Sequence, residues 1–229
     1  MVSECLEALI GIACGVRSEL PKLSQNIEYE VVRSQEDWKQ LIHGEIECIK
    51  SEEKAPRLIF PGTFNPLHEG HLKIKELAES KTQEELFFEI SVSNVDKTPL
   101  SFYEIKKTLD QFSKDQQWIL TNAPTFQQKV KLFPKSTFVV GTDTLMRIFD
   151  ERYYQDQTTM NQALQCFNEY DAKFIVFGRE INKHFHSLDD LKIPSFVRER
   201  FKGVNENEFR MDIRSRDIKR SEEESRKSA

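Results

Sequence analysis

The chain has 229 residues, with 33 Lys and Arg against 38 Asp and Glu and a formal net charge of −5. This length fits one domain of about 150 residues with an extension, or one large and one very small domain, and the acidic balance excludes the basic surface of a dedicated nucleic-acid binder. Its four cysteines lack paired spacing, which argues against a zinc knuckle and favours a reducing compartment. With no apolar run near the roughly 20 residues that span a bilayer and no basic leader, we expect a soluble, cytoplasmic protein.

Residues 1–53 are predicted to form an accessory segment that packs on the main domain. A short helix is expected over residues 3–13 and a brief strand over residues 29–32. A stronger helix is predicted to open at Ser34, with Asp37 as its capping-box partner. Its apolar stripe runs at helical spacing through Trp38, Leu41, Ile42, Ile46 and Ile49.

Residues 54–219 are predicted to form the main domain, because short β-prone runs alternate there with amphipathic helices. Strands are expected at residues 58–60, 86–92, 118–120, 137–140 and 174–177. Capping boxes at Ser101 with Glu104 and at Thr125 with Gln128 predict two of the helices, and another covers residues 160–170. The predicted fold class is therefore α/β, with a doubly wound five-stranded parallel sheet. A last helix is expected near Ser215, and residues 220–229 are predicted to be a disordered tail.

Residues 60–71, FPGTFNPLHEGH, join the first strand to its helix and carry the clearest chemical signal. Gly62 lets the chain turn at the strand end and lets a ligand approach the backbone closely. His68 and His71 stand on either side of Gly70 where the helix starts. At a helix start, unsatisfied N–H groups and the positive end of the dipole attract anions. Two imidazoles at this position predict a phosphate site.

The two histidines allow two other interpretations. As zinc ligands they would need further Cys or His within ligand spacing, and none is present, so no metal site is predicted. They could also be the ordinary polar start of a helix. A Walker phosphate loop is excluded because no Gly-Lys-Ser/Thr follows, and the eight glycines form no Gly-x-Gly-x-x-Gly fingerprint.

The tetrapeptide His68-Glu69-Gly70-His71, preceded by Gly-Thr-Phe-Asn-Pro, resembles the signature of the nucleotidylyltransferase superfamily. That signature is His or Thr, any residue, Gly, His. Within the superfamily the chain is most similar to the nicotinamide mononucleotide adenylyltransferase-like branch. The resemblance spans about residues 56–219 and includes NVDK at 94–97, PTF at 124–126, LFP at 132–134 and VVGTDT at 139–144. It implies the Rossmann-like nucleotidylyltransferase fold.

The resemblance also implies a reaction, in which AMP passes from ATP to a phosphorylated acceptor such as nicotinamide mononucleotide and pyrophosphate is released. Mg²⁺ is the implied cofactor, because a polyphosphate leaving group needs a metal. The alternatives are a cytidylyltransferase or pantetheine-phosphate adenylyltransferase, or a nucleotide-binding regulatory protein with weakened catalysis. No membrane partner is expected, and the basic stretch at 210–219 lacks the interleaved aromatics of a nucleic-acid site. The sequence is compatible with a homo-oligomer but does not indicate one.

The first signature implies roles for the residues around it. His71 would contact the α-phosphate region, and His68 would help to hold the phosphates. The backbone at Gly62, Thr63 and Phe64 would line the nucleotide pocket. Lys97, after the second strand, would meet the substrate phosphate, with an ordinary surface lysine as the alternative.

Two further candidates follow the fourth and fifth strands. Asp143, just after Gly141, would accept the ribose hydroxyls, since open α/β sheets bind ligands outside the carboxyl ends of their strands. Its alternative is the cap of a helix. Arg179 would bind phosphate or serve as a structural ion-pair partner.

The second signature of the superfamily is Ile-Ser-Ser-Thr, any residue, Ile or Leu, Arg, and here residues 213–219 read IRSRDIK. Ser215 is retained, while Arg216 replaces the threonine and Lys219 replaces the arginine. In the family these positions bind the β- and γ-phosphates. Lysine supplies charge without the two-pronged fork of arginine, so the sequence predicts nucleotide binding more firmly than turnover.

Overall fold

The computed structural model describes residues 10–16, 31–94, 98–181 and 184–210. The chain divides into two compact units between Val32 and Arg33. In the first unit, residues 10–13 are helical, so the end of the helix predicted over 3–13 is seen and its start lies outside the described residues. Residues 31 and 32 are not in a strand. The helix predicted near Ser215 and the tail predicted over 220–229 also lie outside.

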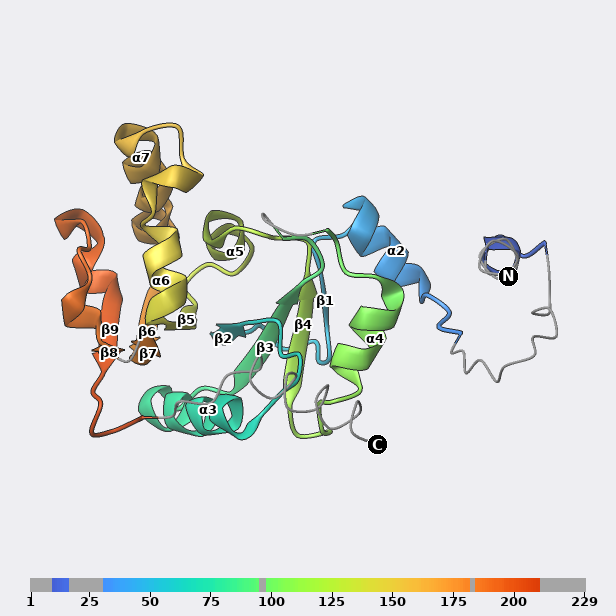
Figure 1. The fold of residues 1–229 in the computed structure, drawn as a ribbon, viewed down its shortest axis with the longest axis horizontal. Helices are drawn as coiled ribbons and strands as arrows, with labels where there is room; N and C mark the ends of the chain where they lie inside the picture. Colours follow the sequence, from blue (N-terminus) through green and yellow to red (C-terminus); the bar gives the residue numbers. More distant parts are fainter. Residues whose placement is uncertain (1–9, 17–30, 95–97, 182–183, 211–229) are drawn as a thin grey trace. The chain divides into compact units, whose positions relative to one another are not determined.

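The second unit is built on one mostly parallel sheet, which confirms the predicted α/β class (Figure 1). Within the described residues the sheet has seven strands in the order β1-β4-β3-β2-β5-β6-β9. Its parallel centre consists of the five predicted strands, β2 (Leu58–Pro61), β3 (Leu86–Ser91), β4 (Gln117–Thr121), β5 (Thr137–Gly141) and β6 (Lys173–Phe177).

Two edge strands were not predicted, so the expected number of five is corrected to seven. β1 (Cys48–Lys50) pairs antiparallel with β4, and β9 (Phe201–Val204) pairs parallel with β6. Both are short, and each is stabilised by pairing with a strand far away in the sequence rather than by a local pattern.

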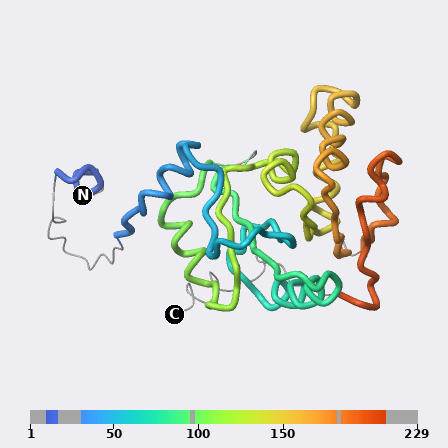
Figure 2. The backbone as a smooth tube through the Cα atoms, turned by 180° about the vertical axis from the view of Figure 1, so that it is seen from behind, coloured from blue at the N-terminus to red at the C-terminus, as the bar shows by residue number. Residues whose placement is uncertain are grey.

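The helices form a layer on each face of the sheet, as can be followed from both sides in Figures 1 and 2. α2 (Glu36–His43), α3 (Glu69–Thr82) and α4 (Phe102–Leu109) pack into one buried apolar cluster. α5 (Phe126–Leu132), α6 (Thr142–Ile148) and α7 (Gln157–Glu169) pack into the other. The predicted capping boxes at the starts of α4 and α5 are both formed.

Smaller elements connect the last helices and strands. The 3₁₀ turn η1 (Glu151–Tyr153) lies between α6 and α7. After β6, the strands β7 (Arg179–Ile181) and β8 (His184–His186) pair as a separate antiparallel ribbon. Two 3₁₀ segments, η2 (Leu188–Asp190) and η3 (Ser195–Arg200), lead into β9.

The helix predicted to run from Ser34 to Ile49 is wrong at both ends. Its N-cap is Gln35, and it stops at Gly44, whose left-handed backbone (φ 75°) ends the hydrogen-bond ladder. Ile49 then lies in β1, opposite Leu120. Since α2 also buries Trp38 in the core (5% exposed), residues 36–50 belong to the sheet-containing unit rather than to a segment packed on it.

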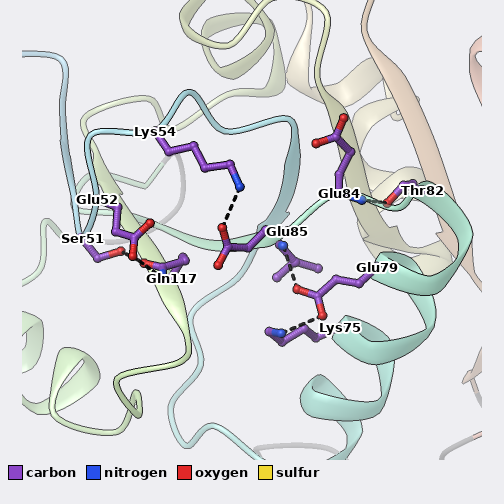
Figure 3. A network of polar contacts seen from close by, with 10 residues as sticks. Ser51, Glu52, Lys54, Lys75, Glu79, Thr82, Glu84, Glu85 and Gln117 are labelled. Atoms are coloured by element: carbon purple, nitrogen blue, oxygen red, sulfur yellow. Dashed lines mark hydrogen bonds and ion pairs between the residues drawn. The ribbon is translucent and has the colours of Figure 1, made fainter.

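Polar side chains join the segments at the amino ends of the strands (Figure 3). Ser51 Oγ donates a hydrogen bond to Gln117 Oε1 (2.7 Å), and Lys54 Nζ donates to Glu85 Oε2 (3.0 Å). Glu79 of α3 accepts a hydrogen bond from the backbone N–H that starts β3 (2.9 Å). We call this set the amino-edge network. Each of these polar groups is hydrogen-bonded to another group of the protein.

Candidate functional site

A cavity of about 760 Å³ lies at the opposite edge, where β2, β3, β5 and β6 end. β3 and β4 extend the sheet on one side of β2, while β5 and β6 extend it on the other. Open α/β sheets bind ligands at such a reversal of strand order. Nine of the predicted site residues line this cavity: Gly62, Thr63, Phe64, His68, Gly70, His71, Gly141, Asp143 and Arg179. Lys97, Ser215, Arg216 and Lys219 lie outside the described residues.

The loop from β2 to α3 is held in a tight, packed conformation. A Cβ atom on Gly62 would lie 2.6 Å from the ring of Phe64, which is itself buried (1% exposed). Phe64 adopts φ 43°, and its carbonyl accepts a hydrogen bond from Gln111 Nε2 (3.0 Å). Gln111 Oε1 in turn accepts from the N–H of Leu67 (2.8 Å). Gln111 therefore holds both ends of the turn, a role that no sequence pattern indicated.

The two histidines lie against each other at the start of α3. Their rings stack with centroids 3.7 Å apart and planes 22° from parallel. The backbone N–H of His68 donates to His71 Nδ1 (3.3 Å), so the hydrogen of the neutral ring is on Nε2. Burial, followed by the nearby charges of His68 and Arg179, lowers the pKa of His71 to about 3. His71 is thus a neutral donor at physiological pH.

His68 is the more accessible of the two rings. Burial and the charge of Arg179 lower its pKa below the usual 6.5. Its Nδ1 is buried and has no hydrogen-bond partner. Because Arg179 lowers the pKa of both imidazoles, its positive charge acts across the histidine end of the cavity.

Asp143 and Arg179 form an ion pair at the cavity, with 3.3 Å between Oδ2 and Nη1. The helix α6 is capped by Gly141 without any side-chain hydrogen bond, so Asp143 does not act as the cap. The second carboxylate oxygen of Asp143, Oδ1, is buried without a partner. A Cβ on Gly141 would lie 2.5 Å from this oxygen. Arg179 is therefore an ion-pair partner and a cavity-lining cation at once.

Sequence reasoning missed a buried charged cluster on the β3 side of the cavity. Glu89 of β3 (1% exposed) accepts hydrogen bonds at Oε1 from Thr121 Oγ1 and, at 2.6 Å, from Lys129 Nζ. Both Glu89 and Lys129 line the cavity. Glu89 Oε2 and the nearby Ser91 Oγ are buried without partners. The available signal was a single glutamate inside the apolar strand LFFEIS.

Unpartnered polar atoms are concentrated in this cavity. Among the described residues, six buried side-chain nitrogen or oxygen atoms have no hydrogen-bond partner. Four of them line the cavity: His68 Nδ1, Glu89 Oε2, Ser91 Oγ and Asp143 Oδ1. Buried polar groups in folded proteins are almost always hydrogen-bonded, so this concentration indicates a binding site for a polar ligand.

Comparison with known proteins assigns the class. Residues 59–221 match the model of the cytidylyltransferase-like family, so the chain belongs to this family and carries a nucleotidylyltransferase-type domain. The predicted superfamily is confirmed, while the nicotinamide mononucleotide branch stays a prediction. A search of curated proteins found no significant match. Among the helices of the described residues, none has the length and apolar character needed to cross a bilayer.

Proposed function

We propose that this protein is an adenylyltransferase that transfers AMP from ATP to a small phosphorylated acceptor, with nicotinamide mononucleotide as the favoured one. The observation that carries the proposal is the convergence of two histidines, an Asp–Arg pair and four unpartnered polar atoms on one cavity at the reversal of strand order. An active site of this family has to bind two polar ligands side by side, and the cavity extends to both sides of β2.

The reaction needs positioning and charge stabilisation rather than covalent catalysis. An acceptor phosphate oxygen attacks the α-phosphorus of ATP, and the bond from that phosphorus to the bridging oxygen breaks. The electron pair leaves with pyrophosphate. His71 is suited to donate from Nε2 to an α-phosphate oxygen, because its low pKa keeps the ring in one protonation state. Arg179 supplies positive charge to the same part of the cavity.

Mg²⁺ is proposed as the cofactor that accompanies ATP. The described residues contain no group of three His, Cys, Asp or Glu side chains that could hold a metal ion. This fits an ion bound mainly by substrate phosphates and water, with one or two protein carboxylates. Asp143, which lines the cavity with an unpartnered oxygen, is the carboxylate placed to contribute. When bound, the ion would neutralise charge on the leaving pyrophosphate.

Arg216 and Lys219 of the altered second signature are proposed to bind the triphosphate tail. Neutralising both should weaken the binding of ATP strongly and that of AMP little, because AMP has no β- or γ-phosphate. Equal affinities for ATP and AMP in that double variant would remove these residues from the proposed site.

Pyrophosphate release tests the proposed function. The purified chain would be incubated with Mg²⁺, ATP or CTP, and each member of a panel of phosphorylated acceptors, with acceptor-free reactions as the control for hydrolysis. We expect the fastest acceptor-dependent release with ATP and nicotinamide mononucleotide. Faster release with CTP would indicate a cytidylyltransferase. Measurable ATP binding without release from any pair would identify a nucleotide-binding protein that has lost catalysis.

A further inference from the structure

We infer that Glu89 forms an acceptor subsite that recognises a neutral hydrogen-bond donor, so that the enzyme prefers an amide-bearing acceptor to the corresponding acid. This inference rests on the proposed function and extends it to the choice of substrate. The subsite would distinguish two possible acceptors of the proposed reaction, nicotinamide mononucleotide and nicotinic acid mononucleotide. They differ only in a carboxamide against a carboxylate.

The position of the carboxylate is fixed by protein contacts. Thr121 and Lys129 both donate to Oε1 of Glu89, which orients the group and leaves Oε2 as the unused oxygen. The glutamate and lysine are 1% and 6% exposed, respectively. A buried carboxylate oxygen without a donor is costly unless a ligand supplies one. Since Glu89 lines the cavity, the missing donor is expected to come from a bound molecule.

The strand order places Glu89 Oε2 in a different half of the cavity from Asp143, the residue expected to contact the nucleotide. Asp143 follows β5, and β5 lies on one side of β2. Glu89 lies on β3, on the other side of β2. If the triphosphate occupies the end with the histidines and Arg179, the second substrate occupies the β3 side. Glu89 then faces the acceptor.

The chemistry of the subsite distinguishes an amide from an acid. A carboxamide nitrogen can donate to Glu89 Oε2. Ser91, two residues along the same strand and therefore on the same face, has an unpartnered hydroxyl that can donate to the carboxamide oxygen. A carboxylate has no hydrogen to offer Oε2 and would bring a second negative charge to it. Lys129 lowers this repulsion, but it lies at Oε1 and supplies no donor to Oε2, so the lost hydrogen bond is the main difference between the two acceptors.

The substitution Glu89→Gln tests the inference. Glutamine keeps an oxygen for Thr121 and Lys129 and places an N–H₂ donor where Oε2 stands. The measured quantity is the ratio of kcat/KM for nicotinamide mononucleotide to that for nicotinic acid mononucleotide. We expect the wild type to favour the amide by at least about tenfold and Glu89→Gln to lower this ratio by about tenfold or more, as sites built around a hydrogen bond discriminate strongly.

Matched variants separate recognition from folding. Ser91→Ala should lower kcat/KM for both acceptors and leave the ratio near the wild-type value. Glu36→Gln changes an exposed carboxylate of α2, outside the cavity lining, and should change neither rate. If Glu89→Gln alone does not fold, the double variant Glu89→Gln/Lys129→Met also removes the buried cation that has lost its counter-charge, and the ratio is measured there.

The outcomes are distinguishable. A lower ratio in the folded Glu89 variant supports the inference. An unchanged ratio with normal turnover overturns it and leaves the proposed function intact. A wild type that releases pyrophosphate with neither of these two acceptors overturns the inference, and release with no acceptor of the panel overturns the proposed function as well.

Discussion

The polar groups at the two edges of the central sheet differ in whether they have hydrogen-bond partners within the protein. At the amino edge, Ser51, Gln117, Lys54 and Glu85 are paired with one another in the amino-edge network (Figure 3). At the carboxyl edge, four buried polar atoms that line the cavity have no partner. The same sheet thus has one edge whose polar groups are satisfied by the protein and one whose groups are left for a ligand.

The two edges are therefore expected to contribute differently to stability and to ligand binding. A paired, partly exposed network contributes little beyond fixing the loops, because exposed ion pairs are weak. Unpartnered buried oxygens and nitrogens destabilise the free protein and become useful when a substrate supplies the missing hydrogen bonds. Substitutions at the two edges should therefore have different consequences, large at the carboxyl edge and small at the amino edge.

The largest effect is expected for His71→Ala. In the proposed reaction, its neutral Nε2–H is needed most as charge develops in the transition state. Loss of one such donor costs on the order of 10²–10³ in kcat, while the affinity for ATP should change only slightly. Rates of pyrophosphate release and titration calorimetry with ATP check the two halves of this expectation. Equal losses in binding and turnover would contradict the role assigned to His71.

A smaller effect is expected for Gly62→Ala, which alters the loop from β2 to α3 that lines the cavity. The new methyl group would lie 2.6 Å from the Phe64 ring, and that ring is enclosed by Phe60, Phe88 and Phe112. Overpacking of this kind costs about 1–3 kcal/mol of stability, measured by urea unfolding. The double variant Gly62→Ala/Phe64→Leu provides more space and should recover part of the loss. No recovery would mean that the clash is not the cause.

The two histidines and the capping boxes could be predicted from the sequence because each is a local pattern. The five central strands were also predictable, since strands of a buried parallel sheet are continuous apolar runs such as residues 174–177. β1 was not, because Ile46 and Ile49 fit helical spacing as well as a strand, and its pairing with β4 is long-range. β9 has an exposed lysine and a glycine within four residues, which weakens any strand pattern.

The site was predicted where it follows a motif and missed where it depends on three-dimensional pairing. Glu89 and Lys129 are 40 residues apart and meet only when α5 packs over β3. Gln111 likewise reaches the loop at Phe64 from beyond the end of α4. No spacing rule links such residues. Their roles can be inferred only from the structure, from the burial of each side chain and the hydrogen bonds that it makes.

The lowered pKa of His71 predicts that the protein loses stability in acid. Above about pH 6.5, His71 is neutral in the folded and unfolded states. Between pH 6.5 and about 3, the unfolded chain binds a proton that the folded protein does not, because the folded pKa is lowered to about 3. The free energy of unfolding should therefore fall as the pH falls, by at most about 1.4 kcal/mol per pH unit for this group.

Urea unfolding of the wild type and His71→Gln at several pH values between 7 and 4 measures this contribution. The wild type should lose stability more steeply than the variant below pH 6.5, and their difference should be constant above it. His68, whose pKa is also lowered, contributes in the same direction in both proteins. Parallel curves throughout would show that the folded protein does not keep His71 neutral.

The smallest effect is expected at the amino edge. Lys54→Met removes an ion pair whose side chains are 54% and 35% exposed. Solvent screens such a pair, so the unfolding midpoint should stay near the wild-type value and pyrophosphate release should not change. A large loss of activity in this variant would break the proposed separation between the two edges.

Hydrogen–deuterium exchange with and without saturating Mg²⁺–ATP tests whether the substrate binds at the carboxyl edge of the sheet, because it locates the ligand in the unmodified chain. We expect slower exchange in peptides that cover residues 60–71 and 139–147, and unchanged exchange in peptides that cover residues 51–57 and 83–86. Protection confined to the amino-edge peptides, or no protection at the carboxyl edge while ATP is bound, would contradict it.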